Sequence, residues 1–63
     1  MQKRVDLLGR PYWVGLYREE TYQWLAIGEI ADTPIAVVAR TSSQAIEKWR
    51  VAAVACLQGN AAL

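Results

Sequence analysis

The feature that most constrains this chain is a helix signature near its end. Thr41 followed three residues later by Gln44 matches a capping box, and Gly59 suits the left-handed position that terminates helices. A helix is therefore expected from about residue 42 to residue 58. Its main apolar stripe, at helical spacing, consists of Ile46, Trp49, Ala53, Cys56 and Leu57.

The second half of this helix is apolar on both sides. From Val51 to Leu57 the sequence carries no polar side chain, although a helix in a small domain normally has one polar face toward solvent. Cys56 is the only cysteine and there is no histidine, so neither an internal disulfide nor a zinc site is expected to stabilise the fold. We expect a homodimer through Val51, Val54 and Ala55. The alternative is a solvated, alanine-rich helix end.

The segment PYWVGLYREETYQWLAIGEI predicts a β-hairpin, because both arms are rich in aromatic and branched residues. If the charged residues 18–21 form the turn, Tyr17 faces Tyr22. Side chains alternate along a strand, so an aliphatic face and an aromatic face follow. The aliphatic face would hold Val14, Leu16, Leu25 and Ile27. The aromatic face would hold Trp13, Tyr17, Tyr22 and Trp24.

The predicted fold is a single α+β domain over residues 1–63, a three-stranded antiparallel β-meander followed by one C-terminal helix packed on one sheet face (β-β-β-α). Residues 1–10 form a short basic arm, in which VDLL could add an edge strand. Residues 11–40 form the sheet, with the turn at ADTP and a third strand at 35–40, and residues 41–59 form the helix. The aliphatic face is the natural partner of the helix, and the reverse packing is the alternative. Either arrangement leaves one apolar sheet face uncovered.

The residue types argue against an enzyme and against a cofactor or metal. No histidine is present to act as a base near neutral pH, and Cys56 lies within the apolar helix, where a thiol is unreactive. Glu19 and Glu20 fall in the expected turn. No apolar run approaches the roughly 20 residues that span a membrane. The single cysteine and the lack of a signal peptide indicate a cytoplasmic protein.

The uncovered sheet face predicts a macromolecular partner. Trp and Tyr are enriched at binding hot spots, so Trp13, Tyr17, Tyr22 and Trp24 are the candidate contacts for a protein partner. The alternative is a nucleic-acid-binding protein that uses these aromatics with basic side chains. Those side chains are Lys3, Arg4, Arg10, Arg18 and Arg40. A net charge of +1 is low for that role. A third possibility is a structural assembly subunit.

Three segments, PYWVGLY, WLAIGEI and TSSQAIEKW, resemble the N-terminal domain of HicB-type antitoxins in their order and pattern. The segment ADTPIAV stands where that family usually has a PGC-like sequence. The resemblance implies a domain without catalytic activity that binds a partner protein. It agrees with the expectation of a small protein-binding module of the adaptor, inhibitor or antitoxin kind.

Overall fold

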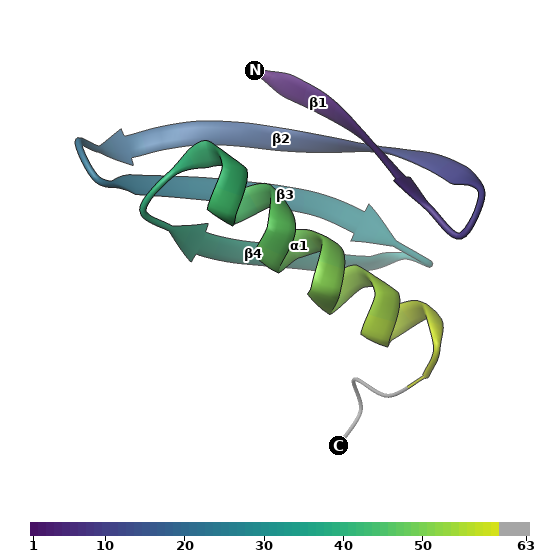
Figure 1. Ribbon diagram of the computed structural model, residues 1–63. Coiled ribbons are helices and arrows are strands. Elements are labelled where there is room, and N and C mark those ends of the chain that lie inside the picture. Colours follow the sequence, from purple (N-terminus) through teal and green to yellow (C-terminus); the bar gives the residue numbers. More distant parts are fainter. Residues whose placement is uncertain (60–63) are drawn as a thin grey trace.

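The computed structural model describes residues 1–59 as a four-stranded antiparallel sheet with one helix on one face (Figure 1). The strands β1 (Gln2–Leu7), β2 (Arg10–Glu20), β3 (Gln23–Ile30) and β4 (Thr33–Ala39) lie in sequence order, and α1 (Ser42–Leu57) follows. The α+β class, the meander and the C-terminal helix are thus confirmed. The prediction of three strands was wrong, because residues 2–7 of the expected basic arm pair with β2 as β1.

Two tight turns explain the fourth strand and the end of β3. Leu8 and Gly9 have φ values of 51° and 82° between the paired residues Leu7 and Arg10. Ala31 and Asp32 have φ values of 50° and 67° in the turn from β3 to β4. Two consecutive positive φ angles define the type I′ turn, whose twist matches that of antiparallel strands. A two-residue reversal at Leu8 and Gly9 therefore folds the first residues back along β2.

The turn from β2 to β3 differs from the prediction. Glu20 pairs with Gln23 across the two-residue turn, and a register shift lies between Arg18 and Glu20. Tyr17 consequently pairs with Leu25 and not with Tyr22, an offset of 25 − 22 = 3 residues. An odd offset turns every side chain of one strand to the other face. The predicted face assignment of β3 was therefore wrong.

The corrected register places different residues under the helix. Val14, Leu16, Ala26 and Ile30 are buried on the helix side, and Trp24 is half-buried against the same core. Leu25 and Ile27, predicted to face the helix, lie on the opposite side. Trp24, predicted for the opposite side, packs against the core instead. For β2 the assignment of Val14 and Leu16 to the helix side was correct.

The helix begins and ends as its sequence predicts. Thr41 is the N-cap, and its Oγ1 accepts a hydrogen bond from Gln44 N at 3.1 Å. At the other end, Gly59 has a φ of 78°, and its N–H donates to Cys56 O at 3.1 Å. The buried face of α1 consists of Ala45, Trp49 and Ala53. Ala45 and Ala53, one turn before and one turn after Trp49, are small and let the helix lie close to the sheet.

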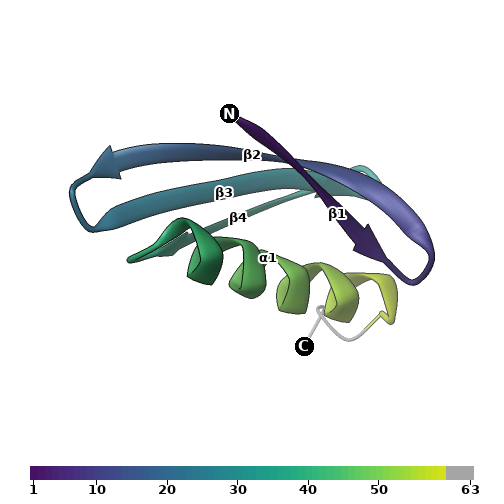
Figure 2. The same ribbon diagram turned by 45° about the horizontal axis from the view of Figure 1, so that its top comes forward.

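Trp49 fixes the helix over β3 and β4. Its side chain is fully buried, and its Nε1–H donates to Ile35 O at 3.1 Å. A Cβ atom at Gly28 would lie only 2.7 Å from Trp49 Cζ2, so the glycine makes the room for the indole ring. The helix contacts β3 and β4 far more than β1 and β2. The sheet curves and β1 crosses at an angle to the rest (Figure 2), and Val5 and Leu7 are still buried.

Candidate functional site

The sheet surface opposite the helix carries exposed apolar side chains and is called the open face below. Along β2, β3 and β4 its apolar members are Trp13, Tyr17, Leu25, Ile27, Ala36 and Val38. Trp13 is 63% exposed, Tyr17 51%, Val38 43% and Ile27 39%. Side chains of this size are normally buried in a domain, so the open face is the first candidate for a binding surface.

The strand register brings these side chains into neighbouring rows. Leu25 pairs with Tyr17 on one side and with Val38 on the other. In the next row Ile27 pairs with Gly15 and with Ala36. Same-face residues directly opposite each other have Cβ atoms about 5 Å apart. The apolar part of the open face is therefore continuous from β2 across β3 to β4.

Tyr17 lies over a gap in this surface. Gly15 is buried although it belongs to the open face, because a Cβ built there would lie 2.9 Å from Tyr17 Cε2 and 3.2 Å from its hydroxyl oxygen. The phenol ring thus covers the backbone of Gly15 in β2. The ring remains half-exposed on its outer side, where a partner can contact it.

Polar side chains border the open face on the β1 side. Arg4 pairs with Trp13 in the register, and its Nε donates to Asp6 Oδ1 at 3.1 Å. Both side chains of this ion pair are mostly exposed, with 60% and 66% of their surface accessible. An apolar centre with a charged rim is the usual composition of a protein-binding surface.

The four aromatic residues predicted as contacts do not share one face. Trp13 and Tyr17 lie on the open face as expected. Tyr22 lies in the β2–β3 turn and is 77% exposed, whereas Trp24 is half-buried on the helix side. Sequence reasoning missed Ile27 as an exposed residue because the assumed turn gave the wrong register, and it assigned Val38 to neither face.

The helix residues predicted for self-association differ in exposure. Val51 is 64% exposed, whereas Val54 and Ala55 are half-buried and Val54 packs against the core. Beside Val51, between α1 and β4, is an open groove of about 430 Å³. It is lined by Val37, Glu47, Lys48, Val51 and Ala52. A largely apolar surface therefore extends from the helix to the outer edge of β4.

The basic residues proposed for nucleic-acid contact are distributed over the molecule. Arg4 belongs to the open face, and Lys3 lines a hollow with Ser42 and Arg50 beside the helix. Arg10 lies next to Leu57 at the other end of the helix. Arg18 is near the β2–β3 turn, and Arg40 follows β4. The fold does not gather these five cations into one patch.

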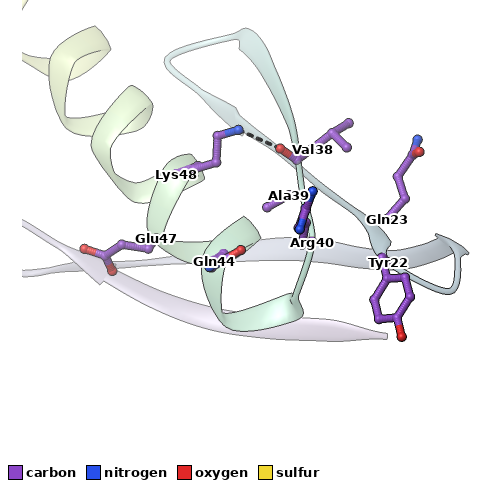
Figure 3. A pocket seen from close by; sticks show the side chains of 8 residues that line it. All are labelled: Tyr22, Gln23, Val38, Ala39, Arg40, Gln44, Glu47 and Lys48. Atoms are coloured by element: carbon purple, nitrogen blue, oxygen red, sulfur yellow. Dashed lines mark hydrogen bonds between the residues drawn. The ribbon is translucent and has the colours of Figure 1, made fainter.

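A shallow hollow of about 550 Å³ lies where β4 meets the start of the helix (Figure 3). Its lining residues are Tyr22, Gln23, Val38, Ala39, Arg40, Gln44, Glu47 and Lys48. Figure 3 shows Lys48 reaching from the helix to the strand, and its Nζ donates to Val38 O at 2.7 Å. The hollow is open to solvent. The hydrogen bond from Lys48 Nζ to Val38 O joins its helix side to the edge of β4.

Within residues 1–59, no group of three or more His, Cys, Asp or Glu side chains is placed to hold a metal ion. The same part of the chain holds no helix with the length and apolar character needed to cross a membrane. No family model, no curated protein and no solved structure matches the chain.

Proposed function

We propose that this chain is a small protein-binding module that binds its partner through the open face of the sheet. The observation that carries the proposal is the exposure of Trp13 and Tyr17 on a four-stranded sheet, beside Ile27 and Val38. Trp and Tyr bury a large area at a small entropic cost and dominate many interfaces. No chemistry is required of these side chains in this role.

The charge distribution favours a protein over a nucleic acid as the partner. A nucleic acid requires cations aligned along its phosphates, and phosphate contacts supply most of its non-specific affinity. Among the residues of the open face, Arg4 is already held by Asp6 at 3.1 Å. Lys3, Arg10 and Arg18 belong to strand positions that alternate with the open face. Arg40 follows β4 and lines the hollow between that strand and the start of the helix. A ligand on the open face would therefore meet mostly apolar atoms.

The test is site-specific photo-crosslinking followed by a direct titration. A photoreactive phenylalanine analogue replaces Tyr17, and a matched control carries it in place of Arg50 on the exposed helix surface. We expect one protein to crosslink at position 17 and not at position 50. The purified protein should then bind the wild-type chain, and Trp13→Ser with Tyr17→Ser should weaken binding by about 100-fold.

Salt dependence distinguishes the two classes of partner. An apolar protein interface should keep most of its affinity at about 0.5 M salt, whereas a nucleic-acid complex loses affinity steeply. Binding of a DNA duplex or RNA strand that is unaffected by the Trp13 and Tyr17 substitutions and is abolished by salt would contradict the proposal. Undiminished binding of the crosslinked protein to the double variant would also contradict it.

A further inference from the structure

The outer edge of β4 differs from the outer edge of β1. β1 carries Lys3, Arg4 and Asp6 among its six residues, and charged side chains on an edge strand discourage pairing with another chain. β4 has the sequence TPIAVVA, with no charged residue along its length. An uncharged, apolar edge strand is a template for adding another strand. Pro34 is the residue of β4 that limits such pairing, because it has no N–H. The β4 edge is therefore better suited to extension than the β1 edge.

Two observations show which backbone groups of β4 face outward. Pro34 has no N–H to give to β3, and proline in a sheet is found where that side of the residue faces away from the neighbouring strand. Lys48 Nζ reaches Val38 O from the helix side of the edge. Because backbone direction alternates along a strand, the outward groups belong to Pro34, Ala36 and Val38.

We infer that β4 pairs with β4 of a second copy of this chain, antiparallel and across a two-fold axis at Ala36. In this register the Ala36 N–H donates to the O atom of the partner's Ala36, and the Val38 N–H donates to that of the partner's Pro34. The two-fold axis generates a second, equivalent copy of the bond from Val38 and of the bond from Ala36. Val38 O lies opposite the partner's Pro34, which has no N–H to donate. This carbonyl oxygen already accepts a hydrogen bond from Lys48 Nζ.

The position of the helix fits the same arrangement. α1 packs on both β3 and β4 and runs obliquely across them (Figure 1). In the paired sheet, the second copy of α1 would lie on the same side of the sheet, across the two-fold axis.

The facing side of the helix is suited to this contact. Lys48, Val51, Ala52 and Ala55 are spaced at i, i+3, i+4 and i+7, which places them on one helical face. Val51 and Ala52 line the groove beside Val37 at the β4 edge. The second copy would bring its own Val37, Val51 and Ala52 to the same place, and the 64% exposed Val51 would become buried.

This dimer does not rest on the proposed function, since it uses an edge of the sheet and not the open face. Light scattering should give twice the 7.0 kDa mass of one chain at micromolar concentration. Ala36→Pro removes the N–H at the two-fold axis and should raise the dimer dissociation constant about tenfold or more. Ala36→Ser keeps that N–H in a side chain of similar size and should remain dimeric.

A second variant and an amide measurement keep the result interpretable if Ala36→Pro unfolds. Val51→Lys changes an exposed side chain, so each chain should fold, with the near-ultraviolet circular dichroism of buried Trp49 retained, and the dimer should dissociate. Hydrogen exchange should show the Ala36 and Val38 amides protected in the wild type and unprotected in Val51→Lys. A monomeric wild type up to about 100 µM would overturn the inference. A dimer that survives Val51→Lys, or that dissociates with Trp13→Ser and Tyr17→Ser, would also overturn it.

Discussion

Substitution of Gly28 by alanine tests the closest approach between the helix and the sheet. The new Cβ would lie 2.7 Å from Trp49 Cζ2, 3.2 Å from Trp49 Cε2 and 3.1 Å from the backbone O of Trp13. The indole ring is fully buried and its Nε1–H is bonded to Ile35 O, so the ring has no free direction in which to move. The helix must therefore move away from the sheet.

The expected cost follows from two opposing terms. Forcing an additional carbon into a packed core costs about 1–3 kcal/mol. Replacing glycine by alanine in a strand stabilises the folded state by about 0.5–1 kcal/mol, because the unfolded chain has less conformational entropy. We therefore expect Gly28→Ala to lower the free energy of unfolding by about 1–2 kcal/mol. In a domain of this size each 1 kcal/mol lowers Tm by about 4–8 °C.

Gly15→Ala is the matched control on the other face of the sheet. Its Cβ would lie 2.9 Å from Tyr17 Cε2, which is nominally a similar clash. Tyr17, however, is 51% exposed, and its ring can rotate outward into solvent. The same chemical change should therefore be close to neutral, or stabilise the domain by up to about 0.5 kcal/mol.

Urea unfolding followed by far-ultraviolet circular dichroism, at one fixed protein concentration, measures both variants. The Gly28→Ala midpoint should fall clearly below that of the wild type, while the Gly15→Ala midpoint stays near it. Equal midpoints for the two variants would refute the reasoning, because exposure of the opposing ring would then not decide the cost. A Gly28→Ala protein as stable as the wild type would show that Trp49 does not hold the helix at this position.

Two further predictions concern the turns and the helix cap. Leu8→Asn creates an Asn-Gly type I′ turn in place of a branched residue at a φ of 51°, and should raise the free energy of unfolding by about 0.5–1 kcal/mol in urea titrations. A destabilised variant would contradict the turn assignment. Thr41→Ala removes the acceptor of Gln44 N and should cost about 1 kcal/mol, whereas Thr41→Ser should restore most of the midpoint; equal losses would exclude capping.

The helix could be predicted from the sequence because its signals are local. The side chain of Thr41 contacts a backbone group only three residues away, and Gly59 is needed for its own φ angle. Burial of Trp49 and Ala53 follows from helical spacing alone. None of these features requires knowledge of what the helix packs against, so one sequence is sufficient.

The sheet register could not be predicted in the same way, because it depends on a turn with an ambiguous sequence. The segment REETYQ has no glycine, proline or asparagine, and the reversal occurs one step beyond the charged residues, after a bulge at Arg18–Glu20. That displacement turned Trp24 inward and Ile27 outward. A usable signal was the small pair Ala26 and Gly28 on alternate positions, which leaves room for a tryptophan on the helix.

The two proposed surfaces follow from one asymmetry of the fold. The helix lies over β3 and β4, while the buried Val5 and Leu7 draw β1 toward the core at an angle to the other strands (Figure 2). The angle of β1 and its charged side chains make this edge of the sheet unsuited to pairing with another strand. At the other edge, α1 crosses over β4 and leaves this uncharged strand accessible (Figure 1). Pairing two such edges would place the Ala36 and Val38 side chains of both copies side by side on the open faces. The two open faces would then form one continuous sheet surface, with a Trp13 and a Tyr17 on each side of the two-fold axis. A protein partner that is itself two-fold symmetric would match that surface better than one with a single contact region.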